Sequence, residues 1–161
     1  MDTYIGVKLV EAEQMTLGAY NEFKGWAIPE NEDPNREGYL VKYSEDYISW
    51  CPKEVFEKHN LQIEKADSIS QSDVDSFCSH YSCNKVGEKT TLVVFSMRNG
   101  FEITETSSCV DPNNYNEGKG LEICTARAQD KVWGYLGFLL QSARNGFDNF
   151  KRWEGISHPM G

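Results

Sequence analysis

The chain has 161 residues, 39% of them hydrophobic and 12% aromatic, which is enough for a packed core in one domain or two small ones. No stretch approaches the roughly 20 apolar residues of a bilayer-spanning helix, and no basic region precedes an apolar run at the start, so we expect a cytoplasmic protein with no membrane partner. The formal net charge of −9 argues against nucleic acid as a partner, because that binding depends on lysine and arginine side chains that neutralise phosphates.

The charge is unevenly distributed along the chain. Residues 1–76 carry 16 acidic and 7 basic side chains, whereas residues 77–161 carry 9 of each. The acidic half suits either a solvated surface or contact with a basic protein surface. The five cysteines are odd in number and lack Cys-x-x-Cys spacing, so we expect reduced thiols and no disulfide framework.

Residues 1–60 predict a small acidic, aromatic α+β module. Alternating apolar residues predict a strand over residues 3–10. Thr16 and Gly25 are typical of the two ends of a short helix over residues 17–23. The stretch 29–38, with two prolines and no apolar residue, predicts an exposed loop.

A hairpin follows, with residues 45–46 as its two-residue loop. This loop would place Tyr43 opposite Ile48 and Val41 opposite Trp50, which makes one face of the hairpin apolar.

Pro52 then suits the first position of a helix. Three side chains of this helix would close over the small sheet: Val55, Phe56 and His59. Residues 61–75 lose apolar periodicity and gain serine and charge, so they predict a linker.

Residues 76–153 predict a second unit, built from a hairpin and a long helix. Just before the hairpin, apolar residues at three- and four-residue spacings predict a short helix over residues 73–83. In the hairpin, a three-residue turn that ends at Gly100 with a positive φ would pair Met97 with Phe101 and Phe95 with Ile103. The apolar face of the hairpin then consists of Val93, Phe95, Met97, Phe101 and Ile103.

Asp111 and Pro112 predict the cap and first turn of the long helix. Its apolar stripe consists of Leu121, Cys124, Ala128, Val132, Leu136 and Leu139. Residues 133–140 are apolar on every side, so we expect them to be buried within the domain or against another subunit. This pattern predicts a homo-oligomer with Trp133, Phe138 and Leu140 as interface residues, and residues 154–161 as a loose tail.

Four cationic side chains form the candidate site for a small anionic ligand: Arg98, Lys119, Arg127 and Lys131. Lys119 lies between two glycines in a sparse form of a phosphate-binding loop, without the full motif. Arg127 and Lys131 are four residues apart and share one helix face. Ordinary surface ion pairing explains this face equally well.

Thiols and imidazoles give no defined reactive centre. Cys78, His80 and Cys83 are close in sequence, but a structural zinc site needs a fourth ligand. Cys109 could act as a nucleophile beside a histidine, and nothing in the sequence selects the partner. We therefore predict no catalytic residue, no metal and no cofactor.

Several short motifs carry a family resemblance. Residues 99–103, 107–112 and 131–133 are similar to a hairpin Asn-Gly-Phe-Glu-Ile, a Ser-Ser-Cys-Val-Asp-Pro segment and a Lys-Val-Trp helix end. Over residues 74–140 the chain resembles the gene-49-product-like family of small proteins from tailed phages. Residues 38–57 also resemble a module found upstream in such proteins. The resemblance implies a phage origin and brings no established chemistry.

These observations predict an α+β protein of two small units that acts by binding and not by catalysis. The leading hypothesis is a phage or prophage accessory protein, a host-takeover or anti-defence factor that binds and inactivates a host protein. The alternative is a sponge that sequesters a small anionic signal such as a cyclic nucleotide. A cysteine- or carboxylate-based enzyme is the third hypothesis.

Overall fold

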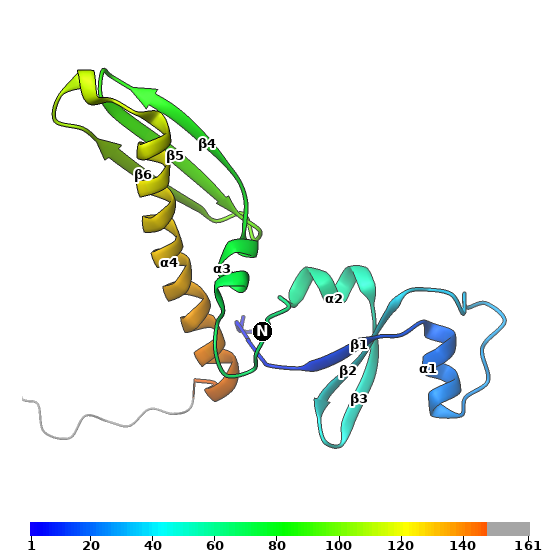
Figure 1. Cartoon of the computed structure of the whole chain (residues 1–161). Helices are drawn as coiled ribbons and strands as arrows, with labels where there is room; N and C mark the ends of the chain where they lie inside the picture. Colours follow the sequence, from blue (N-terminus) through cyan, green and yellow to red (C-terminus); the bar gives the residue numbers. More distant parts are fainter. Residues whose placement is uncertain (148–161) are drawn as a thin grey trace, which may run out of the picture. The chain divides into compact units, whose positions relative to one another are not determined.

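The computed structural model describes residues 1–147, which fall into two units divided between Gln62 and Ile63. Each unit contains one three-stranded antiparallel sheet with helices, which confirms the predicted α+β class (Figure 1). The predicted tail, residues 154–161, lies outside the described residues. Within residues 1–147, no helix is long and apolar enough to cross a membrane.

The first unit is a sheet with strand order β1-β2-β3 and two short helices. Its elements are β1 (Glu11–Gln14), α1 (Leu17–Lys24), β2 (Gly38–Ser44), β3 (Tyr47–Pro52) and α2 (Lys53–His59). The predicted ends of α1 are confirmed, because the Thr16 hydroxyl accepts a hydrogen bond from the Ala19 amide and Gly25 has a φ of 69°. Val41 in β2 is completely buried.

The strand predicted over residues 3–10 is wrong. The first strand begins at Glu11, which lies opposite Lys42, and Ile5 is 88% exposed. Beyond Lys42, β2 soon reaches its turn, so residues before Glu11 have no neighbouring strand to pair with.

The predicted hairpin exists, but its register is wrong by one residue. Lys42 lies opposite Ile48, and Leu40 lies opposite Trp50. Tyr43 is the extra residue of a β-bulge between Lys42 and Ser44, and one extra residue shifts all later pairs.

The helix α2 begins one residue later than predicted, with Pro52 as its cap. Of its three predicted packing residues, only Phe56 packs on the sheet, where its ring stacks on Tyr39 with the centroids 4.4 Å apart. Val55 and His59 are exposed.

The second unit packs one long helix across a sheet with strand order β4-β5-β6 (Figure 1). Its elements are α3 (Gln71–Phe77), β4 (Cys78–Val86), β5 (Thr90–Met97), β6 (Glu102–Ser108), a 3-10 turn η1 (Pro112–Asn114) and α4 (Glu117–Asn145). The helix predicted over residues 73–83 is correct only as far as Phe77. From Cys78 onward the chain is a strand, because pairing with β5 satisfies its backbone and overrides the helical spacing.

The hairpin β5–β6 confirms the three-residue turn. Gly100 has a φ of 84°, Met97 pairs with Phe101 through a 2.8 Å backbone hydrogen bond, and Phe95 lies opposite Ile103. Four of the five predicted face residues are buried beneath α4: Val93, Phe95, Met97 and Ile103. Phe101 is 54% exposed.

The long helix begins at Glu117, where the Asn116 side chain accepts a hydrogen bond from the Lys119 amide. Asp111 and Pro112 instead start the short turn η1. The buried stripe advances in four-residue steps through Cys124, Ala128, Val132, Leu136 and Leu140. The prediction that Leu139 belongs to the buried stripe and Leu140 to the interface is therefore wrong. Leu139 is 40% exposed, whereas Leu140 is 8% exposed and belongs to the core.

Candidate functional site

An open depression of about 400 Å³ lies in the first unit, beside the start of α2. It is lined by Arg36, Glu37, Lys53, Glu54 and Glu57. The first two of these residues precede β2, and the others lie in α2. The chain before β2 and the helix after β3 meet here because Lys53 donates a backbone hydrogen bond to the Glu37 carbonyl.

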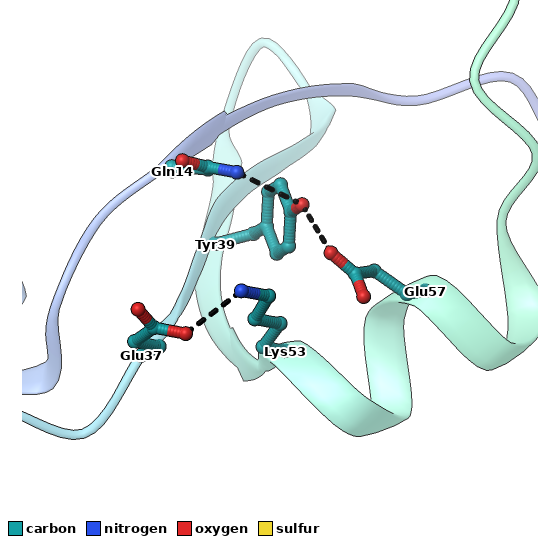
Figure 2. A network of polar contacts seen from close by, with 5 residues as sticks. All are labelled: Gln14, Glu37, Tyr39, Lys53 and Glu57. Atoms are coloured by element: carbon teal, nitrogen blue, oxygen red, sulfur yellow. Dashed lines mark hydrogen bonds and ion pairs between the residues drawn. The ribbon is translucent and has the colours of Figure 1, made fainter.

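A polar network orders the side chains of this depression (Figure 2). The Tyr39 hydroxyl donates to Glu57 Oε1 at 2.8 Å and accepts from Gln14 Nε2 at 3.5 Å. Lys53 Nζ lies 2.8 Å from Glu37 Oε2. Because the Tyr39 ring is fixed by its stack on Phe56, the Glu57 carboxylate is held in place through a rigid side chain.

The remaining charges are paired around the same depression. Arg36 lies 2.8 Å from Glu54 and stacks over the Trp50 ring, with 5.7 Å from its guanidinium carbon to the ring centroid. Within residues 1–147, Glu57 has no ion-pair partner, so its negative charge is the one left unbalanced in the depression.

The pKa values of two of these groups shift in the direction that favours their charged forms. The hydrogen bond to Glu37 and the charge of that carboxylate raise the pKa of Lys53 above 10.5. Hydrogen bonds from its own backbone amide and from Arg36 lower the pKa of Glu54 below 4.5. Both shifts therefore favour the charged forms of Lys53 and Glu54 at neutral pH.

We expect the contribution of the Arg36–Glu54 pair to disappear in acid. Because the pKa of Glu54 is lower in the folded state, its contribution is present above about pH 4.5 and is lost as the pH falls through the folded pKa. The variant Glu54→Gln should melt at a lower temperature than the wild type at neutral pH, and this difference should shrink as the pH falls below about 4.5. Thermal unfolding followed by circular dichroism measures the melting temperatures of the two proteins at each pH. The matched control is Glu22→Gln, which removes an exposed carboxylate of α1. A difference that persists unchanged in acid would contradict this role.

The four cations predicted from the sequence lie in the second unit and do not form one cluster. Arg127 and Lys131 lie together along β6, where Arg127 donates to the Thr106 carbonyl at 2.8 Å and Lys131 pairs with Glu105. Lys119 lies eight residues from Arg127, or about 12 Å along the helix, and pairs with Glu122 at 3.4 Å.

Arg98 lies in the β5–β6 turn. The backbone amide of Arg98 donates a hydrogen bond to the Phe77 carbonyl at 2.9 Å, and this bond fixes the position of the turn. Glu105, with only 11% of its side chain exposed, anchors Lys131, and their hydrogen bond raises the pKa of Lys131. Arg127 and Lys131 therefore use their charge to hold α4 against β6.

The outward side of α4 carries two of the three predicted interface residues. Phe138 is 74% exposed and Trp133 is 36% exposed, whereas Leu140 points into the core. The neighbouring Tyr135 is 46% exposed, and its ring contacts that of Phe101 edge to face at 5.6 Å. The described residues of the second unit thus cover only half of the apolar end of the helix.

Within residues 1–147, the cysteines and histidines form no defined reactive centre. Burial raises the pKa of the Cys124 thiol, which is the opposite of the shift that activates a nucleophile. The Cys109 thiol donates to the Asp111 carbonyl at 3.1 Å. In the part of the chain that the structure describes, no group of three or more His, Cys, Asp and Glu side chains could hold a metal ion.

Sequence reasoning missed the depression of the first unit. Lys53 and Glu57 were available as a pair four residues apart on one helix face, which is a detectable signal. The contacts of Lys53 with Glu37 and of Glu57 with Tyr39 depend on how α2 packs over β2. No local sequence pattern predicts this packing.

The fold and the site define a two-unit α+β protein in which a small acidic unit precedes a three-stranded sheet covered by one long helix. Residues 59–144 match the phage protein (N4 Gp49/phage Sf6 gene 66) family. This match covers more than half of the chain, so the protein belongs to that family, and the resemblance predicted over residues 74–140 is confirmed. No curated protein and no solved structure matches the chain.

Proposed function

We propose that this phage protein is a non-enzymatic accessory factor that binds and inactivates a host protein in the host cytoplasm. The depression of the first unit is the binding site, and it takes a lysine or arginine side chain of the partner. The observation that carries the proposal is the Glu57 carboxylate, which the Tyr39 hydroxyl holds at 2.8 Å and which has no ion-pair partner within residues 1–147.

The surroundings of Glu57 favour a basic partner. Residues 1–62 carry 12 acidic and 6 basic side chains, so the unit as a whole attracts positive charge. Arginine suits the depression best, because its planar guanidinium donates two parallel hydrogen bonds to a carboxylate.

Aromatic side chains elsewhere on the unit provide further contact surface. Phe23, Trp26 and Tyr47 are each between 58% and 59% exposed. Such side chains give large contact areas for little loss of conformational entropy, which is why they dominate binding energies at interfaces.

The electrostatics of the depression favour binding over proton transfer. A general acid needs a carboxyl group whose pKa is raised toward neutrality. The pKa of Glu54 is instead lowered, and the Arg36 guanidinium stays paired with it. Groups held firmly in their charged forms are suited to recognition.

The test is capture from host lysate by the tagged full-length chain. The wild type should retain one host protein in stoichiometric amount, and the variant Glu57→Gln should lose most of it, because the amide keeps the Tyr39 hydrogen bond but carries no charge. Glu22→Gln removes an exposed carboxylate of α1 and should capture the protein normally. The captured protein should also dissociate between about 0.1 and 1 M salt, where the Debye length falls from about 10 to 3 Å.

Two outcomes would count against this function. Equal capture by Glu57→Gln and Glu22→Gln would remove the depression from the interface. Capture without loss of the partner's own activity would make the protein a ligand of that partner and not its inhibitor.

A further inference from the structure

The middle of α4 contains two glycines that the packing of the described residues does not require. Gly134 and Gly137 both lie in the helix interior, and a Cβ built on either meets no atom within 4 Å among the described residues. Glycine is unfavourable at such a position because it loses more backbone entropy than alanine on folding. An external contact that needs a close approach to the backbone would account for both glycines.

Large aromatic side chains flank this pair of glycines. Phe138 is 74% exposed and Trp133 is 36% exposed. At 100° per residue, Trp133 and Phe138 point about 140° apart around the helix, with Gly134 and Gly137 between them. The face therefore consists of a shallow backbone hollow beside a projecting ring.

This face is complementary to itself under a two-fold rotation. In an antiparallel contact between two α4 helices centred midway between Gly134 and Gly137, Gly134 of one copy lies opposite Gly137 of the other. The same rotation brings Phe138 of one copy to the level of Trp133 of the other, on the opposite edge of the contact. A two-fold interface uses one patch on both copies, so each copy must supply both the hollow and the ring, as this one does.

The polar ends of the face agree with the same pairing. Asp130 and Gln141 are both exposed and continue the line of the glycines in steps of three and four residues. The two-fold rotation brings Asp130 of one copy opposite Gln141 of the other, where an amide donor meets a carboxylate acceptor.

We propose that two copies of this chain associate through antiparallel α4 helices, with Phe138 of each copy seated over the glycines of the other. Trp133 and Phe138 together expose roughly 200 Å² of aromatic surface on this face, since aromatic side chains present about 150–250 Å² each. Tyr135 points about 130° away from the line of the glycines and lies outside the contact. The interface is therefore smaller than the roughly 1,200 Å² of standard stable complexes and falls in the range of weak ones. The dimer is therefore concentration-dependent.

The first test measures mass by light scattering from about 5 to about 500 µM protein. The wild-type mass should double over this range. The double variant Gly134→Leu/Gly137→Leu fills the hollow and should remain monomeric, and Phe138→Ser should do the same. Gly118→Leu, at an exposed position near the start of α4, is the matched control and should dimerise normally.

Loss of folding does not confuse this readout. Leucine has a higher helix propensity than glycine, so the double variant should melt no lower than the wild type at a concentration where both are monomers. The antiparallel arrangement has its own test: oxidation of mixed Asp130→Cys and Gln141→Cys chains should yield a mixed disulfide at a level above that of either variant alone.

Two results would overturn the proposal. One is a wild-type monomer at every concentration. The other is a dimer that survives the double leucine variant.

Discussion

The variant Leu136→Ala should lower the free energy of unfolding of the second unit by about 3 kcal/mol, within the roughly 2–5 kcal/mol seen for buried leucines. Leu136 is 1% exposed and lies at the centre of the buried stripe of α4. Its loss removes apolar contacts and leaves a cavity between the helix and the sheet, which close packing prevents from collapsing fully. Urea unfolding followed by far-ultraviolet circular dichroism measures the change.

The matched control is Leu139→Ala, three residues further along the same helix. Leu139 is 40% exposed, so its truncation should cost about 1 kcal/mol or less. The same chemical change thus separates the two sides of α4. Equal losses for the two variants would show that the helix is rotated relative to the packing described.

The success of the sequence predictions for β5–β6 has a physical cause. The alternation of apolar residues and the positive φ required at Gly100 independently select the same turn, and pairing across the hairpin satisfies both. The buried stripe of α4 was predictable for the same reason, since the helical period persists over many turns. The error between Leu139 and Leu140 arose because three- and four-residue steps are both compatible with that period.

The missed features all depend on distant partners. The segment after Phe77 has apolar spacings that suit a helix or a strand, and the free edge of β5 decides the outcome. The register of β2–β3 was missed because Tyr43 forms a bulge, where its ring packs on that of Tyr47 at 5.4 Å. Composition contains no sign of this one extra residue.

The candidate sites show the same division. The exposure of Phe138 and Trp133 could be predicted from the sequence, because residues 133–140 are apolar on every side and a single sheet can cover only one side of a helix. The role of Glu57 was hidden, because it rests on a hydroxyl from another element and on the pairing of the nearby Lys53 with Glu37. Single-sequence reasoning finds unbalanced apolar surface more easily than unbalanced charge.

The second large effect is expected from Gly38→Ala at the start of β2. A Cβ at this position would lie 2.5 Å from the Cys51 carbonyl oxygen and would overlap the Trp50 ring. Neither neighbour has room to retreat, because the Trp50 indole donates to the Met15 carbonyl at 2.8 Å and Cys51 is held opposite Tyr39 in the sheet. Overpacking of this kind costs about 1–3 kcal/mol, and backbone contact places Gly38→Ala near 3 kcal/mol.

The consequence of Gly38→Ala should extend to the depression, since Glu37 is the adjacent residue and Tyr39 follows in β2. We expect a lower unfolding midpoint for the first unit and, at temperatures where the unit is still folded, weaker capture of the host protein. Gly6→Ala is the control, because a Cβ there meets no atom within 4 Å among the described residues, and it should leave both measurements unchanged. If Gly38→Ala retained the wild-type midpoint, the close contact between β2 and the Trp50 ring would be wrong. The position of Tyr39, and through it that of Glu57, would then not depend on this close contact of β2.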